Sequence, residues 1–388
     1  MRQEKAMPRS IQGTFEPGFA PVVQMLQDML QQPEQRGAAL CVYQHGQRVI
    51  DVWAGVVDRA GRQPWQEDTL VNVFSSGKPV LAVVVLQLVA EGRLQLDAPV
   101  SSYWPEFAQA GKQAITLRQL LSHRSGLSAI GEPLPPAALF DWQRMVQALE
   151  QQQPWWTPGK AHGYAPMTYG WLLGELVRRV DSCMPGAAIA QRIAGPLGLE
   201  FYVGLGEAQL KRVSDVSRIK NAQGDEVAQR LYARMLQAKT LTGKAFTNPP
   251  SMMTSSNKPE WRTMQQPAAN AHADARALAG FYNGLLQGRL LPGDLLNEVQ
   301  REHSSGMDRT LLAETRFGLG CMLEQQGKPY ASYGLGMRAF GHPGAGGTLG
   351  CADPEHGLAV GFVTNSMDAY VMMDRRAQAL NRCLLTCI

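Results

Sequence analysis

The hydrophobic and polar positions of the chain change from a strand-like to a helix-like pattern within the first hundred residues. Residues 39–57 (ALCVYQHGQRVIDVWAGVV) hold two stretches rich in β-branched and aromatic side chains, separated by the polar residues 44–47. This pattern predicts an antiparallel hairpin. Residues 74–92 (FSSGKPVLAVVVLQLVAEG) then run almost wholly apolar from Val80 to Ala90 and end at Gly92. They predict a buried helix of about four turns, too short to span a bilayer.

The middle of the chain, residues 96–280, alternates helical patterns with loops rich in Pro and Gly, and strand patterns are scarce there. Residues 211–267 are polar, and residues 247–259 (TNPPSMMTSSNKP) predict a lid or surface excursion of the kind that often sets specificity. Helical periodicity predicts helices at 117–122, 142–152, 168–180 and 274–287.

Strand-like patterns return near the end of the chain and are followed by one amphipathic helix. Strands at both ends with helices between them predict an α+β fold, in which a mainly antiparallel sheet flanked by helices carries an inserted all-helical domain. A site is then expected in the cleft between the two parts. The late strands are predicted at 316–324, 338–353 and 357–365, and the helix at 369–385.

We expect the sheet domain to be discontinuous, because its strands come from both ends of the chain. Residues 1–95 and 281–388 are predicted to form this α/β sheet domain. Residues 96–280 are predicted to form the mostly helical domain with variable lid loops.

Composition narrows the class of protein. Apolar residues make up 45% of the 388 positions and charged residues 18%, which predicts an ordered globular protein. The net charge is +4, and Lys and Arg are dispersed, so a nucleic-acid binder is not expected. Six widely spaced cysteines without a Cys-x-x-Cys pair, and histidines without metal-ligand spacing, argue against a disulfide framework and a metal site.

The N-terminal residues 1–18 are basic but lack the apolar region and the cleavage site of a secretory signal. We therefore expect a cytoplasmic protein with reduced thiols, no membrane segment and no cofactor. The oligomeric state is left open, and a homo-oligomer is compatible with the sequence.

Two serines and a lysine stand at the start of the predicted helix 74–92. If the helix begins near Ser75, then Ser75 and Lys78 share one face with Cβ atoms about 5 to 6 Å apart, while Ser76 points elsewhere. A helix N-terminus lowers the pKa of a nearby, partly desolvated lysine and offers N–H groups to an oxyanion. Ser75 is then a candidate nucleophile with Lys78 as a proton relay. The alternative is that the serines only cap the helix.

Tyr164 lies on a short loop in TPGKAHGYAPMTYGWLLGELVRR, residues 157–179, just before a predicted helix. A tyrosine acts as a base only if its pKa falls from about 10 toward 7, which requires roughly 4 kcal/mol of preferential stabilisation of the phenolate. A neighbouring ammonium group in a dry cleft is a source of that stabilisation. The alternative is an aromatic residue that only packs on the helix.

The glycine-rich segment FGHPGAGGTLG, residues 340–350, follows a strand pattern. Glycines let a backbone edge approach a ligand closely, so the N–H of Ala345 could complete an oxyanion hole with that of Ser75. The alternative is a hairpin without a ligand.

These segments together resemble the serine hydrolase family of class C β-lactamases, penicillin-binding proteins and family VIII carboxylesterases. The resemblance spans residues 20–388, is weakest between 200 and 270, and implies that family's fold: an antiparallel sheet beside an all-helical domain. It also implies Ser75 as the acylated nucleophile, Lys78 as the relay, Tyr164 as the base, and the N–H groups of Ser75 and Ala345 as the oxyanion hole. The motifs are residues 75–78, 120–127, 158–175 and 341–365.

The departures from the family pattern favour an esterase over a β-lactamase. Pro166 occupies the position of the Asn in the β-lactamase Tyr-x-Asn motif, and His342-Pro343-Gly344 replaces Lys-Thr-Gly. Without that lysine and threonine, which engage the substrate carboxylate, penicillins and cephalosporins should bind weakly. His342 is then expected to position Tyr164 or the leaving-group oxygen, or else to be structural.

The remaining pocket residues are expected to come from loops. Gly344 is assigned to the substrate edge, and Trp155 and Trp156 are either structural or walls of the acyl pocket; His123 is expected to be structural. No Gly-x-Ser-x-Gly occurs, which excludes the α/β-hydrolase nucleophile elbow.

The function predicted from the sequence is hydrolysis of a small carboxylic ester with a short to medium acyl group. An acyltransferase or a D-amino-acid peptidase using the same site, a weak β-lactamase, and a non-catalytic scaffold stay open as alternatives.

Overall fold

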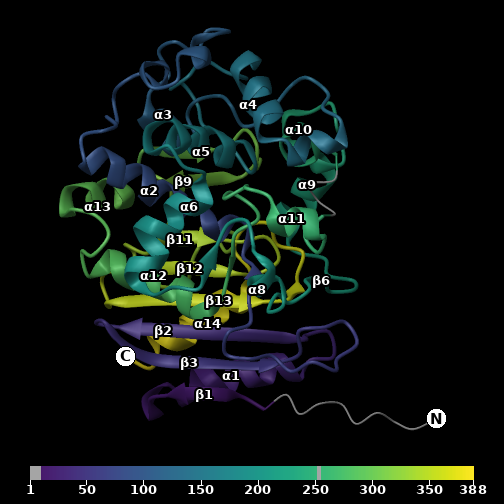
Figure 1. The fold of residues 1–388 in the computed structure, drawn as a ribbon. Coiled ribbons are helices and arrows are strands. Elements are labelled where there is room, and N and C mark those ends of the chain that lie inside the picture. Colours follow the sequence, from purple (N-terminus) through teal and green to yellow (C-terminus); the bar gives the residue numbers. More distant parts are fainter. Residues whose placement is uncertain (1–9, 251–254) are drawn as a thin grey trace.

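The computed structural model describes residues 10–250 and 255–388, in which a nine-stranded antiparallel sheet is overlaid by a mainly helical part (Figure 1). The strand order is β1-β3-β2-β13-β12-β11-β10-β9-β8, so the N-terminal hairpin is extended by strands from the other end of the chain. The predicted α+β architecture is confirmed. The strands are β1 (Gln12–Phe15), β2 (Gly37–Gln44), β3 (Gln47–Gly55), β8 (Ser304–Met307), β9 (Glu314–Phe317), β10 (Met322–Leu323), β11 (Phe340–Pro343), β12 (Leu349–Asp353) and β13 (Leu358–Thr364).

The two ends of the chain meet where β2 pairs with β13, and this pair is buried on both faces. Cys41 faces the core under helix α12 (Ala275–Leu286), whereas Leu40 and Val42 face the core formed with α1 (Ala20–Gln31) and α14 (Arg375–Leu385). Burial on both faces explains the nearly continuous apolar runs of these strands. A glycine at 361 lets α12 approach, because a Cβ there would lie 2.1 Å from the Ala275 carbonyl oxygen.

The helical part is organised around α2 (Lys78–Ala90), which is apolar on every side. Residues Lys78 to Leu86 and Leu88 are all buried, and the helix packs against α5 (Thr168–Asp181). A helix that is hydrophobic on all sides is expected in a protein core. Each of its buried aliphatic side chains stabilises the fold by about 1.5 to 3 kcal/mol relative to the same side chain exposed to water. The other helices are α3 (Leu117–Leu121), α4 (Trp142–Gln151), α6 (Pro185–Ile189), α7 (Gly195–Leu197), α8 (Glu207–Leu210), α9 (Glu226–Met235), α10 (Leu241–Thr247), α11 (Pro259–Thr263) and α13 (Gly293–Gln300).

Two small sheets connect the helical part to the large sheet. Strand β7 lies between β4 and β5, and β6 pairs in parallel with β14. Their bounds are β4 (Val71–Asn72), β5 (Phe201–Tyr202), β6 (Ser217–Arg218), β7 (His272–Ala273) and β14 (Ser366–Met367). The 3₁₀ and π segments are η1 (Pro17–Phe19), η2 (Phe74–Gly77), η3 (Val100–Ser102), η4 (Pro105–Ala108), η5 (Pro136–Phe140) and η6 (Ala190–Ala194).

Several predicted elements begin or divide differently from the sequence pattern. The helix expected over 369–385 begins only at Arg375, because the Asp374 side chain caps it by accepting from the N–H of Arg376. The strand expected over 316–324 is broken between β9 and β10, and the segment 338–353 is two strands joined by a glycine-rich turn. The proposed lid at 247–259 lies partly outside the described residues, which omit 251–254.

The division of the chain into two domains stays a prediction. Helix α12 crosses position 280, where the boundary was expected, and the whole helix lies on β2, β12 and β13. It therefore belongs with the sheet.

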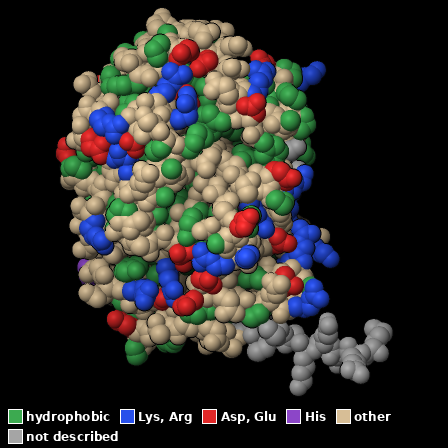
Figure 2. Space-filling view, in the orientation of Figure 1, with side chains coloured by type: hydrophobic (Ala, Val, Ile, Leu, Met, Phe, Trp, Pro, Cys, Tyr) green, Lys and Arg blue, Asp and Glu red, His purple; other side chains and the backbone are tan. Residues whose placement is uncertain are grey.

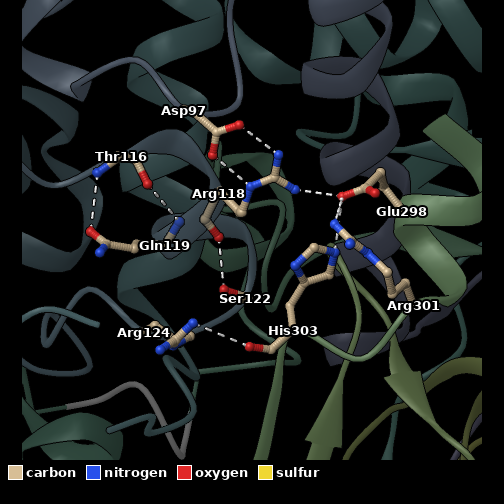
Figure 3. Close-up of polar contacts among 9 residues, drawn as sticks. All are labelled: Asp97, Thr116, Arg118, Gln119, Ser122, Arg124, Glu298, Arg301 and His303. Carbon is tan, nitrogen blue, oxygen red and sulfur yellow. Dashed lines mark hydrogen bonds and ion pairs between the residues drawn. The ribbon is translucent and has the colours of Figure 1, made fainter. Parts of the chain in front are cut away.

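Polar contacts also join the helical part to the segment that precedes β8. Arg118 of α3 donates to both carboxylate oxygens of Asp97 at 2.7 Å and also contacts Glu298 of α13 (Figure 3). Arg301 lies 2.7 Å from the same Glu298 carboxylate. The bidentate pair of Arg118 and Asp97 fixes the orientation of both side chains, because its two parallel hydrogen bonds are directional.

All six cysteines are free thiols, which agrees with the expectation that the chain has no disulfide framework. No helix within residues 10–250 and 255–388 is long and apolar enough to cross a membrane.

Candidate active site

Ser75 lies in the 3₁₀ turn η2, which leads from β4 into α2. The α-helix itself begins at Lys78, three residues later than the sequence predicts, and Phe74 has a left-handed backbone with φ of +47°. Such a conformation in a non-glycine residue costs of order 1–3 kcal/mol and is typical of functional turns. Ser76 is buried and donates to the His342 carbonyl at 3.1 Å, while Ser75 lines a cavity. The two adjacent serines thus have different roles.

Lys78 is fully buried, and its Nζ contacts three oxygens. Ser75 Oγ lies at 3.0 Å, the Pro166 carbonyl at 2.8 Å and the Ala268 carbonyl at 2.9 Å. Because none of these is a carboxylate, burial lowers the pKa of Lys78 well below the usual lysine value. A neutral amine has two N–H groups, which the two carbonyls satisfy, and one lone pair, which is left facing the Ser75 hydroxyl.

Tyr164 contacts Ser75 from the opposite side. Its hydroxyl donates to Ser75 Oγ at 2.8 Å, and Lys78 Nζ lies 4.8 Å from the centre of its ring. Burial raises the pKa of the Tyr164 phenol above its ordinary value, and the hydrogen bond with Ser75 opposes this shift only in part. Desolvation outweighs stabilisation of the phenolate in this state, so the lowered phenol pKa that a tyrosine base requires is not present here. Tyr164 is a protonated donor here.

The backbone that carries Tyr164 is held by a buried carboxylate. Asp308 accepts the Tyr164 N–H, with Oδ2 at 2.9 Å and Oδ1 at 3.1 Å, and also the N–H groups of Thr310 and Leu311 at 2.8 Å. Burial raises the pKa of Asp308, while His162 and these N–H groups oppose the rise. Asp308 was not predicted, because it lies 144 positions from Tyr164 in the chain and no local motif marks it.

A second aromatic residue behind Tyr164 has a structural role. The ring of His123 lies 5.1 Å from that of Tyr164, and its Nδ1 accepts the N–H of Ala165 at 3.2 Å. Burial lowers the pKa of His123 well below its usual value, so the ring is neutral. This agrees with the structural role expected for it.

Two backbone N–H groups border the cavity beside Ser75. Ser75 itself is in the first turn of a helical segment, where N–H groups have no intrahelical partner, and Ala345 lies in the turn between β11 and β12. Gly344 permits this turn, since a Cβ there would lie 2.0 Å from Thr348 Oγ1 and 2.3 Å from the Val73 carbonyl. Ser75 and Ala345 thus both line the cavity, and the oxyanion hole expected from their N–H groups stays a prediction.

The cavity in front of Ser75 has a volume of about 1060 Å³. Its walls come from the turn at η2, the Tyr164 loop, β6, α9 and the segment after β14. The apolar lining includes Phe74, Met167, Tyr232, Met235, Phe246, Trp261, Met367 and Val371, and the polar lining includes Arg59, Ser217, Arg218, Gln223, Gln229, Asn257 and Asp368.

Four residues expected to contact substrate do not line this cavity. Trp155 and Trp156 instead donate from their indole N–H groups to the carbonyls of Ala129 and Ala161 at 2.9 and 3.0 Å. Trp156 is buried and Trp155 is half-buried, and these bonds hold both rings outside the cavity lining.

His342 and Gly344 are also absent from the cavity lining. The His342 ring is buried, its Nδ1 bonds the Pro343 carbonyl at 2.7 Å, and its ring centre lies 5.6 Å from that of Tyr164. Its Nε2 has no hydrogen-bond partner among the described residues, so the expected hydrogen bond to Tyr164 is not formed. Gly344 is buried and shapes the turn rather than lining the cavity.

Metal-ligating side chains meet at one place in the described part of the chain, away from Ser75. Asp353, Glu355 and His356 lie in the turn between β12 and β13. The Asp353 carboxylate accepts from the N–H groups of Gly336 and Glu355 and bonds His356 Nδ1 at 2.7 Å. These hydrogen bonds stabilise the turn between β12 and β13, which explains why the three side chains lie close together.

The comparison with known proteins agrees with this geometry. A family model described as β-lactamase matches residues 22–382. The chain belongs to the β-lactamase family. It is 31% identical to the Mycobacterium tuberculosis protein named esterase/beta-lactamase LipL over 378 residues, which cover 95% of this chain and 86% of that protein.

Solved structures of the β-lactamase family superpose closely on the chain. A penicillin-binding protein homologue from Caulobacter crescentus is 33% identical, with a TM-score of 0.88 and coverage of 98% of this chain and 100% of that one. A family VIII carboxylesterase is 31% identical, with a TM-score of 0.86 and the same coverage. The predicted family and fold are confirmed.

Proposed function

We propose that this member of the β-lactamase family is a serine carboxylesterase, with Ser75 as nucleophile and Lys78 and Tyr164 as its proton-transfer groups. One observation carries the proposal: the Ser75 hydroxyl lies on a cavity wall, 3.0 Å from a buried amine and 2.8 Å from a phenol. The esterase names of LipL and of the family VIII carboxylesterase support an ester as the substrate.

The first half of the reaction forms an acyl-enzyme. Lys78, held neutral by burial, accepts the Ser75 proton as Oγ attacks the ester carbonyl carbon. The carbonyl oxygen becomes an oxyanion and is stabilised by the N–H groups of Ser75 and Ala345. When the carbon–oxygen bond to the alcohol breaks, Tyr164 protonates the departing oxygen, and the proton held by Lys78 replaces the one that Tyr164 has given up.

The second half releases the acid. Water attacks the acyl carbon, the Lys78–Tyr164 pair takes its proton, and Ser75 leaves as the restored hydroxyl. The hydrolysis then needs no redox step and no second substrate besides water.

We favour an ester over a β-lactam as substrate because this chain lacks the positively charged lysine of the β-lactamase Lys-Thr-Gly motif. A buried, neutral His342 stands where that pattern has a lysine, and burial lowers its pKa to about 3. It offers no positive charge to a β-lactam carboxylate. We expect nitrocefin to be hydrolysed slowly, and efficient turnover of nitrocefin would contradict this reasoning.

The decisive experiment compares variants on 4-nitrophenyl butyrate. Ser75→Ala and Lys78→Met should each lower kcat by at least about 1,000-fold, and Tyr164→Phe by somewhat less. Lys112→Met is the matched control, because Lys112 is also fully buried and donates to three carbonyls but does not line the cavity. A folded Ser75→Ala protein with near-normal turnover would overturn the assignment.

The acyl preference is a separate measurement. A panel of 4-nitrophenyl esters from two to twelve carbons should give highest kcat/KM at short to medium length. A fluorophosphonate probe located at Ser75 by mass spectrometry would exclude the non-catalytic scaffold, and labelling at Ser76 instead would contradict the proposed nucleophile.

A further inference from the structure

The cavity in front of Ser75 is charged on one wall. This wall is formed by β6 and β14, whose parallel pairing places Arg218 opposite Met367, with the Ile219 N–H bonded to the Met367 carbonyl at 2.8 Å. Arg59 and Asp368 also line the cavity. In the space-filling view, Lys and Arg side chains gather on the side of the molecule where β6 lies (Figures 1 and 2).

The two cavity arginines differ from their neighbours in having no carboxylate partner within residues 10–250 and 255–388. Nearby arginines are paired: Arg262 with Asp215 at 2.8 Å and Arg376 with Asp374 at 2.8 Å. No ion pair of 4.0 Å or less involves Arg59 or Arg218 in that described part of the chain. These two guanidinium groups are therefore available to a ligand.

The charge balance of the lining is positive. Arg59 and Arg218 outnumber the single lining carboxylate, Asp368, which already accepts the N–H of Ala369 at 2.7 Å. Between this wall and Ser75 the lining is largely apolar, with Phe246 and Trp261 among its members. Arg59 and Arg218 are both exposed, so their interaction with a bound anion is screened by solvent and salt.

The cavity is also larger than a small ester requires. About 1060 Å³ lies at the upper end of the range for sites that hold drug-sized ligands, whereas a butyrate ester fills a small part of it. A ligand that fills more of this volume is larger than a butyrate ester.

We propose that the substrate class is an ester of medium length that carries a second, anionic group, and that Arg218 and Arg59 bind this group while the ester carbonyl lies at Ser75. The inference rests on the proposed esterase function and adds the chemistry of the substrate. A carboxylate is the simplest such group, because the planar guanidinium binds it in a bidentate geometry.

The test measures a charge preference rather than activity alone. The acyl-side probe pair is mono-4-nitrophenyl suberate and its neutral methyl ester, and the alcohol-side pair is 6-(butyryloxy)hexanoate and its methyl ester. In at least one pair the anionic member should have a kcat/KM about five- to tenfold higher at low ionic strength, and added salt should reduce the preference.

Arg218→Gln should abolish most of that preference, mainly by raising KM for the anionic ester. Lys220→Gln is the matched control: it removes the same charge two positions away. Both residues are exposed, but only Arg218 lines the cavity, so Lys220→Gln should keep the preference. Arg59→Gln should reduce the preference for the anionic ester by the same factor as Arg218→Gln or by a smaller one.

Each outcome decides one of the two proposals. If neither pair shows a preference for the anion, or if Lys220→Gln removes it as fully as Arg218→Gln, the anion site is refuted while the esterase stands. If no member of either pair is hydrolysed, the esterase function fails, and the substrate class with it.

Discussion

Replacing Lys78 by methionine gives a direct test of whether the buried amine is neutral, because protonation of Lys78 must then differ between the folded and unfolded chains. In the unfolded chain a lysine has a pKa of about 10.4. In the folded chain burial holds the pKa of Lys78 well below that value. Between these two pKa values the unfolded chain binds one more proton than the folded chain. The free energy of unfolding therefore rises with pH in that window.

The magnitude follows from the linkage relation. One extra proton bound in the unfolded state changes the free energy of unfolding by about 1.4 kcal/mol per pH unit, and the change flattens as the pH nears the unfolded pKa. If the folded pKa lies below 8, the contribution of Lys78 to stability should increase by about 2.5 kcal/mol between pH 8 and pH 10. Lys78→Met lacks the titrating group, so this increase should appear as a pH-dependent difference between wild type and variant.

The assay is urea-induced unfolding of both proteins at pH 8, 9 and 10. Lys78→Met also loses the two hydrogen bonds to the Pro166 and Ala268 carbonyls, but this loss lowers the free energy of unfolding by the same amount at every pH. Protonation of Lys78 is therefore measured by how the wild-type minus variant difference in unfolding free energy changes with pH. Lys112→Met should show a similar slope over this range, since burial lowers the pKa of Lys112 to about 8, and it therefore serves as a positive control for the measurement. A flat difference for Lys78→Met would mean that Lys78 stays charged, and the role of Lys78 as the base would be refuted.

Three further predictions concern the same site. The kcat/KM for 4-nitrophenyl butyrate should fall tenfold per pH unit as the pH drops below the lowered pKa of Lys78, because only the neutral amine accepts a proton, and a flat acid limb would contradict this. Asp308→Asn should lower the free energy of unfolding by about 3 kcal/mol and reduce kcat more than it changes KM, because the amide cannot accept all the N–H groups that now hold Tyr164; unchanged urea unfolding and kcat would refute that role. Gly344→Ala should reduce kcat at least tenfold, since its Cβ would displace Thr348 and the adjoining oxyanion turn, whereas normal kcat would show that the turn tolerates the methyl group.

The parts of this structure that could be predicted from the sequence are those in which neighbours along the chain are also neighbours in space. The spacing of Ser75 and Lys78 is local, so their contact follows from a single helical turn even though the α-helix begins later than expected. The hairpin of β2 and β3 is local for the same reason. A single sheet built from both ends of the chain was predicted from the positions of the strand patterns. The strand order that pairs β2 with β13 was not predicted, because periodicity does not specify long-range pairing.

The contacts that could not be predicted come from distant segments. Asp308 reaches the Tyr164 backbone, and the Ala268 carbonyl reaches Lys78, with no periodic or spacing signal for either. Trp155 and Trp156 were expected to be structural or to wall the acyl pocket; neither lines the cavity, and their indole N–H groups donate to backbone carbonyls. A tryptophan in a loop carries no signal of the direction in which its ring points.

The departures from the β-lactamase motifs have a physical explanation at both positions. Proline at position 166, where the β-lactamase motif has asparagine, does not deprive Lys78 of a hydrogen-bond acceptor. The Lys78 amine donates to the backbone carbonyl of Pro166 at 2.8 Å, and every residue at this position has a backbone carbonyl. The loss of the lysine on the sheet edge does remove a cation, since His342 is buried and neutral. The cavity regains positive charge on another wall, at Arg218 and Arg59. Under the two proposals, separate segments supply acylation chemistry and charge recognition, so the two could change independently in this fold.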